Sequence, residues 1–254
     1  MTQFTVTAVP NIPQVQKGDN LPELILARLA EAGLALRDGD ILAVAQKIVS
    51  KSEGRKVLLS TVQPSERALE VGEQVDKDPR LVELILNESE EISRMRKGVL
   101  VVRHNLGFTS ANAGIDRSNI KQPDGDEVVL LLPVDPDKSA AQLRQALLEK
   151  TGVAVGIVIT DSHGRPFRLG QTGIAIGVAG MPALLDRRGD TDLFGYTLKV
   201  TEIAIADEIA ATADLLMGPG AEGMPVVHIR GLTYAQTDGK ATDLVRPKEF
   251  DLYR

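Results

Sequence analysis

The residues around Asp161 combine side chains that suit metal and phosphate chemistry. Asp161 follows the apolar run VGIVIT and precedes Ser162, so a carboxylate and a hydroxyl are expected at the carboxyl end of a buried strand, where α/β sheets bind ligands. Such hard oxygen donors suit Mg²⁺ or Mn²⁺. Arg165 and Arg168 follow and could grip phosphate or carboxylate groups. The alternative is a polar turn in which Asp161 only caps the loop.

A second carboxylate occurs in a glycine-containing loop that is distant along the chain. The segment NAGIDRSN carries Asp116 and Asn119, and Asp116 could complete a metal site with Asp161. Asp and Asn also form Asx turns readily. The sequence by itself leaves both interpretations open.

Phosphate binding would need local positive charge or free backbone amides, because the net charge of the chain is −6. Lys51 and Arg55 follow a strand-like run and a short turn and could neutralise a polyphosphate, although such a pair commonly faces solvent. Residues 218–223, GPGAEG, match GxGxxG, but a helix precedes and a strand follows, the reverse of a dinucleotide fold. The run could still present amides to a phosphate, or Gly218 could simply end a helix.

Several common enzyme classes are excluded by what the sequence lacks. It contains no cysteine, which excludes disulfides and thiolate metal sites and favours a cytoplasmic location. Its three histidines lack zinc-site spacing, and there is no GxSxG or P-loop pattern. No apolar run approaches the roughly 18 residues of a membrane helix, residues 1–20 do not resemble a signal peptide, and the negative charge argues against nucleic-acid binding. We therefore expect small-molecule substrates.

The elements expected from hydrophobic periodicity mix helices and strands without strict alternation. Strands are predicted over residues 4–9, 40–45, 99–103, 128–132, 153–159, 173–178 and 225–230. Helices are predicted over residues 21–32, 65–75, 79–87, 139–151 and 200–217. Glu88, Glu90 and Glu91 are interpreted as a solvated helix end. The fold class predicted is α+β, with mixed sheets and packed helices around a core of aliphatic side chains, since only 3% of the residues are aromatic.

In order along the chain, these segments resemble the coenzyme F420-0:L-glutamate ligase (F420 gamma-glutamyl ligase) family. The specific motifs are ANAGIDRSN at 111–119 and ITDSHGRPFRLGQTGIAIGVAG at 159–180, in the order and separation of the family. GDILAVAQKIVSKSEGR at 39–55 and ADEIAATADLLMGPGAEGMPVVHIRG at 206–231 extend the resemblance. It covers most of the chain between residues 10 and 231.

The resemblance implies an unusual α+β fold that forms intertwined homodimers and uses GTP with Mg²⁺ or Mn²⁺ at two sites. We expect a single ligase domain over residues 1–254, with two interleaved subdomains as an alternative division. Some bacterial relatives add a C-terminal, nitroreductase-like flavin domain. Because the chain stops at Arg254, neither that domain nor a flavin is expected.

The resemblance also implies roles for individual residues. Asp116 and Asp161 match the positions that bind the first metal, and Ser162 matches the hydroxyl position near the second. Lys51 is grouped with the two aspartates as catalytic, because it would neutralise phosphate charge. The positions expected to contact the nucleotide are Pro10, Asn11, Ile12, Pro13, Gln46, Lys47, Lys51, Asn119, Leu216, Met217, Gly218, Gly220, Glu222 and Gly223. At positions 46 and 47, archaeal relatives have small hydroxyl residues instead.

The activity implied is a GTP-dependent ligation of L-glutamate to coenzyme F420-0 through an acyl phosphate. The expected partners are the small molecules F420-0, L-glutamate and GTP, without nucleic acid or membrane. Two alternatives stay open. One is a γ-glutamate ligase for a folate-like acceptor, and the other is a regulatory protein that binds GTP without turning it over.

Overall fold

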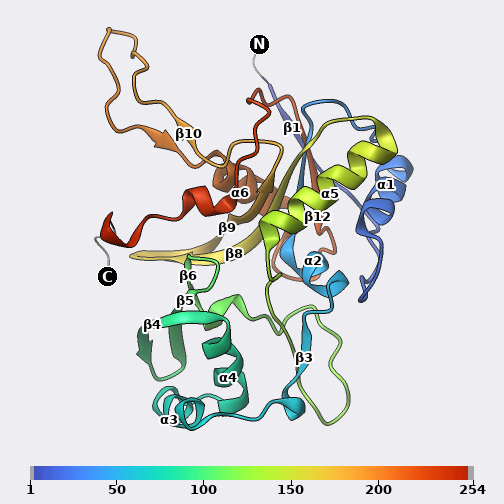
Figure 1. Cartoon of the computed structure of the whole chain (residues 1–254). Coiled ribbons are helices and arrows are strands. Elements are labelled where there is room, and N and C mark those ends of the chain that lie inside the picture. The colour runs from blue at the N-terminus through green and yellow to red at the C-terminus, as the bar shows by residue number, and fades with distance from the viewer. Residues whose placement is uncertain (1–2, 251–254) are drawn as a thin grey trace.

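A five-stranded sheet forms the centre of the molecule. The structure is a computed structural model that describes residues 3–250 (Figure 1). The strand order is β1 (Thr5–Ala8), β12 (Val226–Arg230), β2 (Ile41–Ala45), β8 (Gly156–Arg165) and β9 (Arg168–Ala179). β2 and β8 are parallel, and the other neighbours are antiparallel.

Helices cover both faces of this sheet (Figure 1). α1 (Leu21–Glu31) and α5 (Pro136–Thr151) pack on one face, and α6 (Ile205–Met217) packs on the other. Successive residues of β8 point to opposite faces of the sheet. Ile157 packs in the apolar core on the side of α1 and α5, and Val158 packs in the core on the side of α6. A strand buried on both faces explains why this part of the sequence is continuously apolar.

A smaller unit lies below the central sheet in Figure 1 and has its own apolar core. It contains α3 (Glu66–Val75), α4 (Pro79–Asn87), the three-stranded sheet β4 (Ser89–Arg96), β5 (Val99–His104) and β6 (Thr109–Ala111), and the pair β3 (Lys56–Leu58) and β7 (Val128–Leu130). The short helix α2 (Gln46–Ser52) leads from β2 into this unit. Short 3₁₀ turns occur at Leu59–Thr61, Asn112–Gly114, Ala241–Leu244 and Lys248–Phe250.

The predicted α+β class is confirmed, and most predicted elements are present. Three local predictions were wrong. The short turn expected between the strand at 40–45 and Lys51 is instead part of helix α2. The helix predicted from residue 200 begins at Ile205, after β11 (Glu202–Ile203). Of the glutamates interpreted as a solvated helix end, Glu88 does end α4 as its C-cap, but Glu90 and Glu91 are exposed residues of β4.

Two projecting segments carry exposed apolar side chains. The first is the long excursion between β10 (Leu185–Asp186) and β11, where Leu193 is 98% exposed and Phe194 is 95% exposed. The second is the tip of the β8–β9 hairpin, where Leu169 is 98% exposed. Projecting apolar surface of this kind is typical of a protein–protein contact. No helix among residues 3–250 is long and apolar enough to cross a membrane.

Asp40 anchors the end of the central sheet where β2 begins. Its buried carboxylate accepts hydrogen bonds from His228 Nε2 at 2.8 Å, Arg230 Nε at 2.8 Å and the backbone N–H of Arg37 at 2.8 Å. Burial would raise the pKa of Asp40, but the hydrogen bonds from Arg230 and His228 hold that pKa below its ordinary value. The carboxylate therefore stabilises the fold in its ionised form.

We expect Asp40→Asn to lower the free energy of unfolding by about 1–3 kcal/mol at neutral pH, because the Arg230 guanidinium loses its anion. The folded-state pKa of Asp40 lies below the unfolded value, so the stabilisation is present above the unfolded pKa and is lost as the pH falls through the folded pKa. In urea unfolding, the difference between wild type and variant should narrow in acid. Equal stability at neutral pH would contradict this role.

Candidate active site

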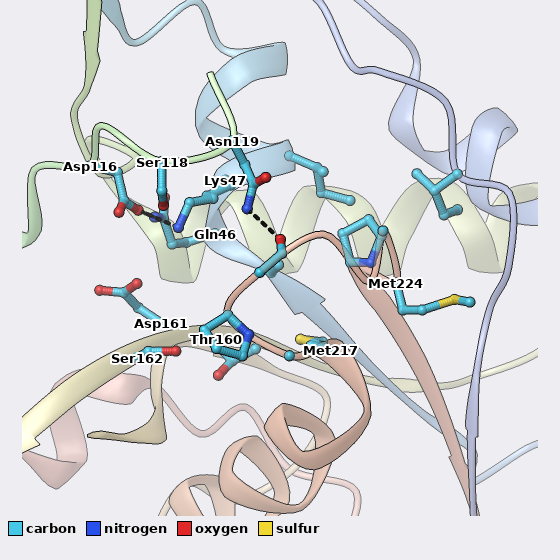
Figure 2. Close-up of a pocket in the computed structure, with 18 of the residues that line it drawn as sticks. Gln46, Lys47, Asp116, Ser118, Asn119, Thr160, Asp161, Ser162, Met217 and Met224 are labelled. Carbon is cyan, nitrogen blue, oxygen red and sulfur yellow. Dashed lines mark hydrogen bonds and ion pairs between the residues drawn. The ribbon is translucent and has the colours of Figure 1, made fainter. Parts of the chain in front are cut away.

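A cavity of about 530 Å³ opens at the edge of the sheet where the parallel pairing of β2 with β8 ends. Figure 2 shows side chains from both the central sheet and the smaller unit pointing into it. Its walls come from residues that are distant in sequence, namely 12–15, 45–48, 51, 116, 118–119, 160–162, 171, 214, 217–221 and 223–225.

Asp161 lies just beyond the last parallel pairing of the central sheet, which joins Ala45 of β2 to Thr160 of β8. The prediction that β8 ends here was wrong. The strand continues to Arg165 because β9 supplies antiparallel partners after β2 has ended. Asp161 nevertheless stands at the carboxyl edge of the parallel pair, the position that suits ligand binding.

Asp116 faces Asp161 from the opposite wall of the cavity (Figure 2). Helix α2 holds its carboxylate, since Lys47 Nζ and Gln46 Nε2 each lie 2.8 Å from Asp116 Oδ2. Burial raises the pKa of Asp116, Lys47 opposes this, and the charge of Asp161 adds to the rise. Two buried carboxylates repel each other when both are ionised, and a cation bound between them would offset this repulsion.

The donor atoms at this place fit a hard divalent cation. Besides the two carboxylates, the hydroxyl of Thr160 is buried without a hydrogen-bond partner and belongs to the same cavity. Among residues 3–250, no three or more His, Asp or Glu side chains gather closely enough to hold a metal by themselves. Further ligands would have to be hydroxyls, water or phosphate oxygens, a mixture usual for Mg²⁺.

Ser162 reaches the cavity from the other side of β8. Successive strand residues face opposite sides, and Asp161 shares its side with His163, whose Nε2 lies 2.9 Å from Asp161 Oδ2. The Ser162 hydroxyl donates to Asp214 Oδ1 of α6 at 3.2 Å. Sequence reasoning missed both His163 and Asp214 as site residues. A signal for Asp214 existed, since an acidic residue in the last turn of a helix is unfavourable.

Three segments meet on the wall that carries the glycine run. Lys51 Nζ donates to the carbonyl oxygen of Asn119 at 2.8 Å. The Asn119 side-chain amide donates to the carbonyl oxygen of Gly220 at 2.9 Å (Figure 2). Lys51 is only 7% exposed, which contradicts the alternative that it is a solvated surface residue. Burial lowers the pKa of Lys51, and the neighbouring charges of Lys56 and Lys47 lower it further.

Most of the residues predicted to contact a nucleotide line this cavity. They are Ile12, Pro13, Gln46, Lys47, Lys51, Asn119, Met217, Gly218, Gly220 and Gly223. Four flank the cavity without lining it, namely Pro10, Asn11, Leu216 and Glu222. Glu222 instead closes the glycine run, accepting a hydrogen bond from the Gly220 N–H at 2.8 Å.

The arginines predicted to bind phosphate or carboxylate groups are not brought to the cavity. Arg165 lies near the tip of the β8–β9 hairpin and donates to the carbonyl oxygen of Leu169 at 3.1 Å, and Arg168 is exposed beside it. Arg55 pairs with Glu88 at 2.8 Å. The cations that line the cavity come from α2.

Similarity to known proteins defines the class of this enzyme. Residues 10–231 match the family model described as F420-0:Gamma-glutamyl ligase. The chain is 44% identical over 253 residues to the coenzyme F420:L-glutamate ligase of Methanothermobacter thermautotrophicus, covering 99% of both chains. It is 45% identical over 235 residues to that of Methanocaldococcus jannaschii, covering 92% of this chain and 90% of the relative. With that of Archaeoglobus fulgidus it shares 43% over 249 residues, covering 98% and 96%.

These similarities identify an enzyme of the ligase class. The chain belongs to the F420-0:gamma-glutamyl ligase family, which confirms the resemblance seen in its motifs.

Proposed function

We propose that this chain is a cytoplasmic ligase that adds L-glutamate in γ-linkage to coenzyme F420-0, with GTP as the phosphoryl donor. The observation that carries the proposal is the pair of facing carboxylates, Asp116 and Asp161, in a cavity that also holds two lysines and a glycine run. The names of the relatives support the choice of substrate. Because the cavity draws its walls from both the central sheet and the smaller unit, we propose that the two act as one domain.

The chemistry is an amide ligation, which needs a good leaving group on the acceptor carboxylate. In the first step, a carboxylate oxygen of F420-0 takes the γ-phosphoryl group of GTP, and GDP leaves. In the second step, the ammonium group of glutamate loses a proton, and the free amine attacks the acyl carbon to form the C–N bond. The C–O bond to phosphate breaks, inorganic phosphate leaves with the bonding pair, and the nitrogen gives up a second proton to become the amide nitrogen.

The side chains of the cavity suit the first step, since phosphoryl transfer depends mostly on positioning and charge neutralisation. Lys47 and Lys51 bring positive charge to a protein whose net charge is −6. The turn from Gly218 to Gly223 can present backbone N–H groups to phosphate oxygens. Mg²⁺ or Mn²⁺, when bound, would neutralise charge on the phosphates. Asp116 and Asp161 would hold one ion, with Ser162 near a second.

Phosphate release separates this proposal from its two alternatives. With GTP, Mn²⁺ and F420-0, the purified protein should release phosphate continuously only when L-glutamate is added. GTP binding without any glutamate-dependent release would favour a regulatory GTP-binding protein. Faster release with a folate-type acceptor than with F420-0 would favour the folate-like ligase.

We further propose that the protein is a homodimer whose chains contact each other through the two projecting apolar segments. A stable interface of this kind buries on the order of 2,000 Å² or more. Light scattering at micromolar concentration should give the mass of two chains. A Phe194→Glu variant should shift that mass toward one chain, whereas Leu69→Glu, at a half-exposed site on α3, should not. A monomeric wild type would contradict the proposal.

A further inference from the structure

Three aspartates line the cavity, and two of them have a basic side chain beside them. Asp116 pairs with Lys47 at 2.8 Å, and Asp161 lies 2.9 Å from the ring of His163. For Asp214, no Lys, Arg or His within residues 3–250 lies at ion-pair distance. Its carboxylate therefore faces the cavity without a protein cation.

Asp214 occupies an unfavourable place for an anion. It lies in the last turn of α6, which ends at Met217 and has no basic residue in that turn. The carbonyl groups at the carboxyl end of a helix carry partial negative charge, which destabilises a carboxylate nearby. A cation bound from solution would offset this cost.

The packing of α6 places this carboxylate beside Ser162. Gly173 is the partner of Ser162 in the β8–β9 ladder. A Cβ on Gly173 would lie 2.5 Å from the carbonyl oxygen of Ala210 and 3.0 Å from the Cβ of Asp214, so only glycine lets the helix come this close. The Ser162 hydroxyl then donates to Asp214 Oδ1 at 3.2 Å.

We infer that Asp214 binds the ammonium group of the incoming amino acid, whose nitrogen becomes the amide nitrogen. The inference rests on the proposed function, in which the amino group of glutamate is the only organic cation among the substrates. An ammonium group offers three N–H donors. Asp214 can accept two of these at its two carboxylate oxygens, while the Ser162 hydroxyl continues to donate to Asp214 Oδ1. Because Asp161 and Ser162 face opposite sides of β8, this subsite is distinct from the Asp116–Asp161 pair.

Hydroxylamine separates amine binding from phosphoryl transfer, because it is a largely uncharged nucleophile at neutral pH and traps an acyl phosphate as a hydroxamate. The full chain is assayed with GTP, Mn²⁺ and F420-0, with either glutamate or hydroxylamine as the nucleophile. For Asp214→Asn we expect the KM for glutamate to rise roughly 10- to 100-fold. The rate of hydroxamate formation should stay within about twofold of the wild type, since no charged contact to the nucleotide is lost.

Two further variants control this result. Asp214→Glu keeps the charge and should recover part of the glutamate affinity that Asp214→Asn loses. Glu208→Gln removes a carboxylate from an exposed position on the same helix and should leave both reactions unchanged. If Asp214→Asn does not fold by circular dichroism, Asp214→Glu alone decides, because a raised KM for glutamate with normal hydroxamate formation is still expected.

Each of the remaining outcomes would contradict one specific statement. Equal loss of glutamate ligation and hydroxamate formation would place Asp214 in the phosphoryl-transfer step, as a ligand of a second metal ion would be. An unchanged KM for glutamate would remove Asp214 from amine binding. Failure of the wild type to form any hydroxamate with GTP would contradict the proposed function itself, and this failure is visible before any variant is made.

Discussion

Asp161→Asn is expected to lower the rate of glutamate ligation by at least about a hundredfold. This is a larger loss of activity than usually follows when a residue that only hydrogen-bonds to a metal ligand is replaced. The substitution keeps the size of the side chain and a contact to His163, but it removes one of the two charges that face each other across the cavity. Of the two carboxylates, only Asp116 would then remain to hold a divalent cation that neutralises phosphate charge. The fold should persist, because Asp161 lies at a cavity wall rather than in an apolar core.

The effect is checked by comparing ligation rates together with thermal unfolding. Asp76→Asn is a matched control, because Asp76 is exposed in the smaller unit and has a left-handed conformation, with φ at 55°, that asparagine also tolerates. It should leave the rate unchanged. A folded Asp161→Asn variant with full activity and unchanged Mn²⁺ affinity would remove Asp161 from the site.

Lys51→Ala is expected to weaken GTP binding by about 1.5–3 kcal/mol, the contribution of a charged hydrogen bond, which corresponds to roughly 10- to 150-fold in affinity. Lys51 is buried on α2 and donates to the carbonyl oxygen of Asn119 at 2.8 Å, so its ammonium group is held in place at the cavity wall. A positioned cation loses little freedom when a phosphate binds, and this makes its contribution large for a single residue.

Calorimetry of GTP binding measures this effect directly. Lys97→Ala is the control, because the Lys97 side chain is 82% exposed and does not line the cavity. The unfolding free energy of Lys51→Ala must be measured as well, since the Asn119 carbonyl loses its donor. A folded variant whose affinity changes by less than about threefold would show that Lys51 does not contact the nucleotide.

The convergence of Asp116 and Asp161 could be predicted from the sequence because each lies in a run of small and polar residues next to an apolar strand. The motif of the Asp116 loop is local, and so is the order of residues after the VGIVIT strand. The approach of these two segments in space depends on the tertiary structure, and we inferred it from the family resemblance. The structure brings them to opposite walls of one cavity.

The parts that sequence reasoning missed depend on tertiary pairing or lack a local signal. Helix α2 begins directly at the end of β2, and its N-cap, Ala45, has no capping side chain, so the usual start signal is absent. Strand β4 has the sequence SEEISRMR, in which most side chains are polar or charged and mask any alternation. Asp214 carries a local signal as an acidic residue in the last turn of a helix, but its proximity to Ser162 follows only from the register that pairs Ser162 with Gly173.

The prediction for Arg165 and Arg168 was wrong for a related reason. The loop expected after Asp161 is a continuation of β8, which ends at Arg165, and β9 begins at Arg168, so both arginines lie at the tip of the hairpin, away from the cavity. Register shifts between Ile159 and Thr160 and between Gly164 and Arg165 alter the path of the strand. Such irregularities have no simple sequence signature.

The most direct test of the central claim is mass spectrometry of F420-0 after incubation with the purified protein, L-glutamate, GTP and Mn²⁺. We predict a product heavier than F420-0 by one or more glutamyl residues, formed only when glutamate and GTP are both present and lost in Asp161→Asn. An unchanged F420-0 mass after incubation with folded protein that binds GTP would contradict the account.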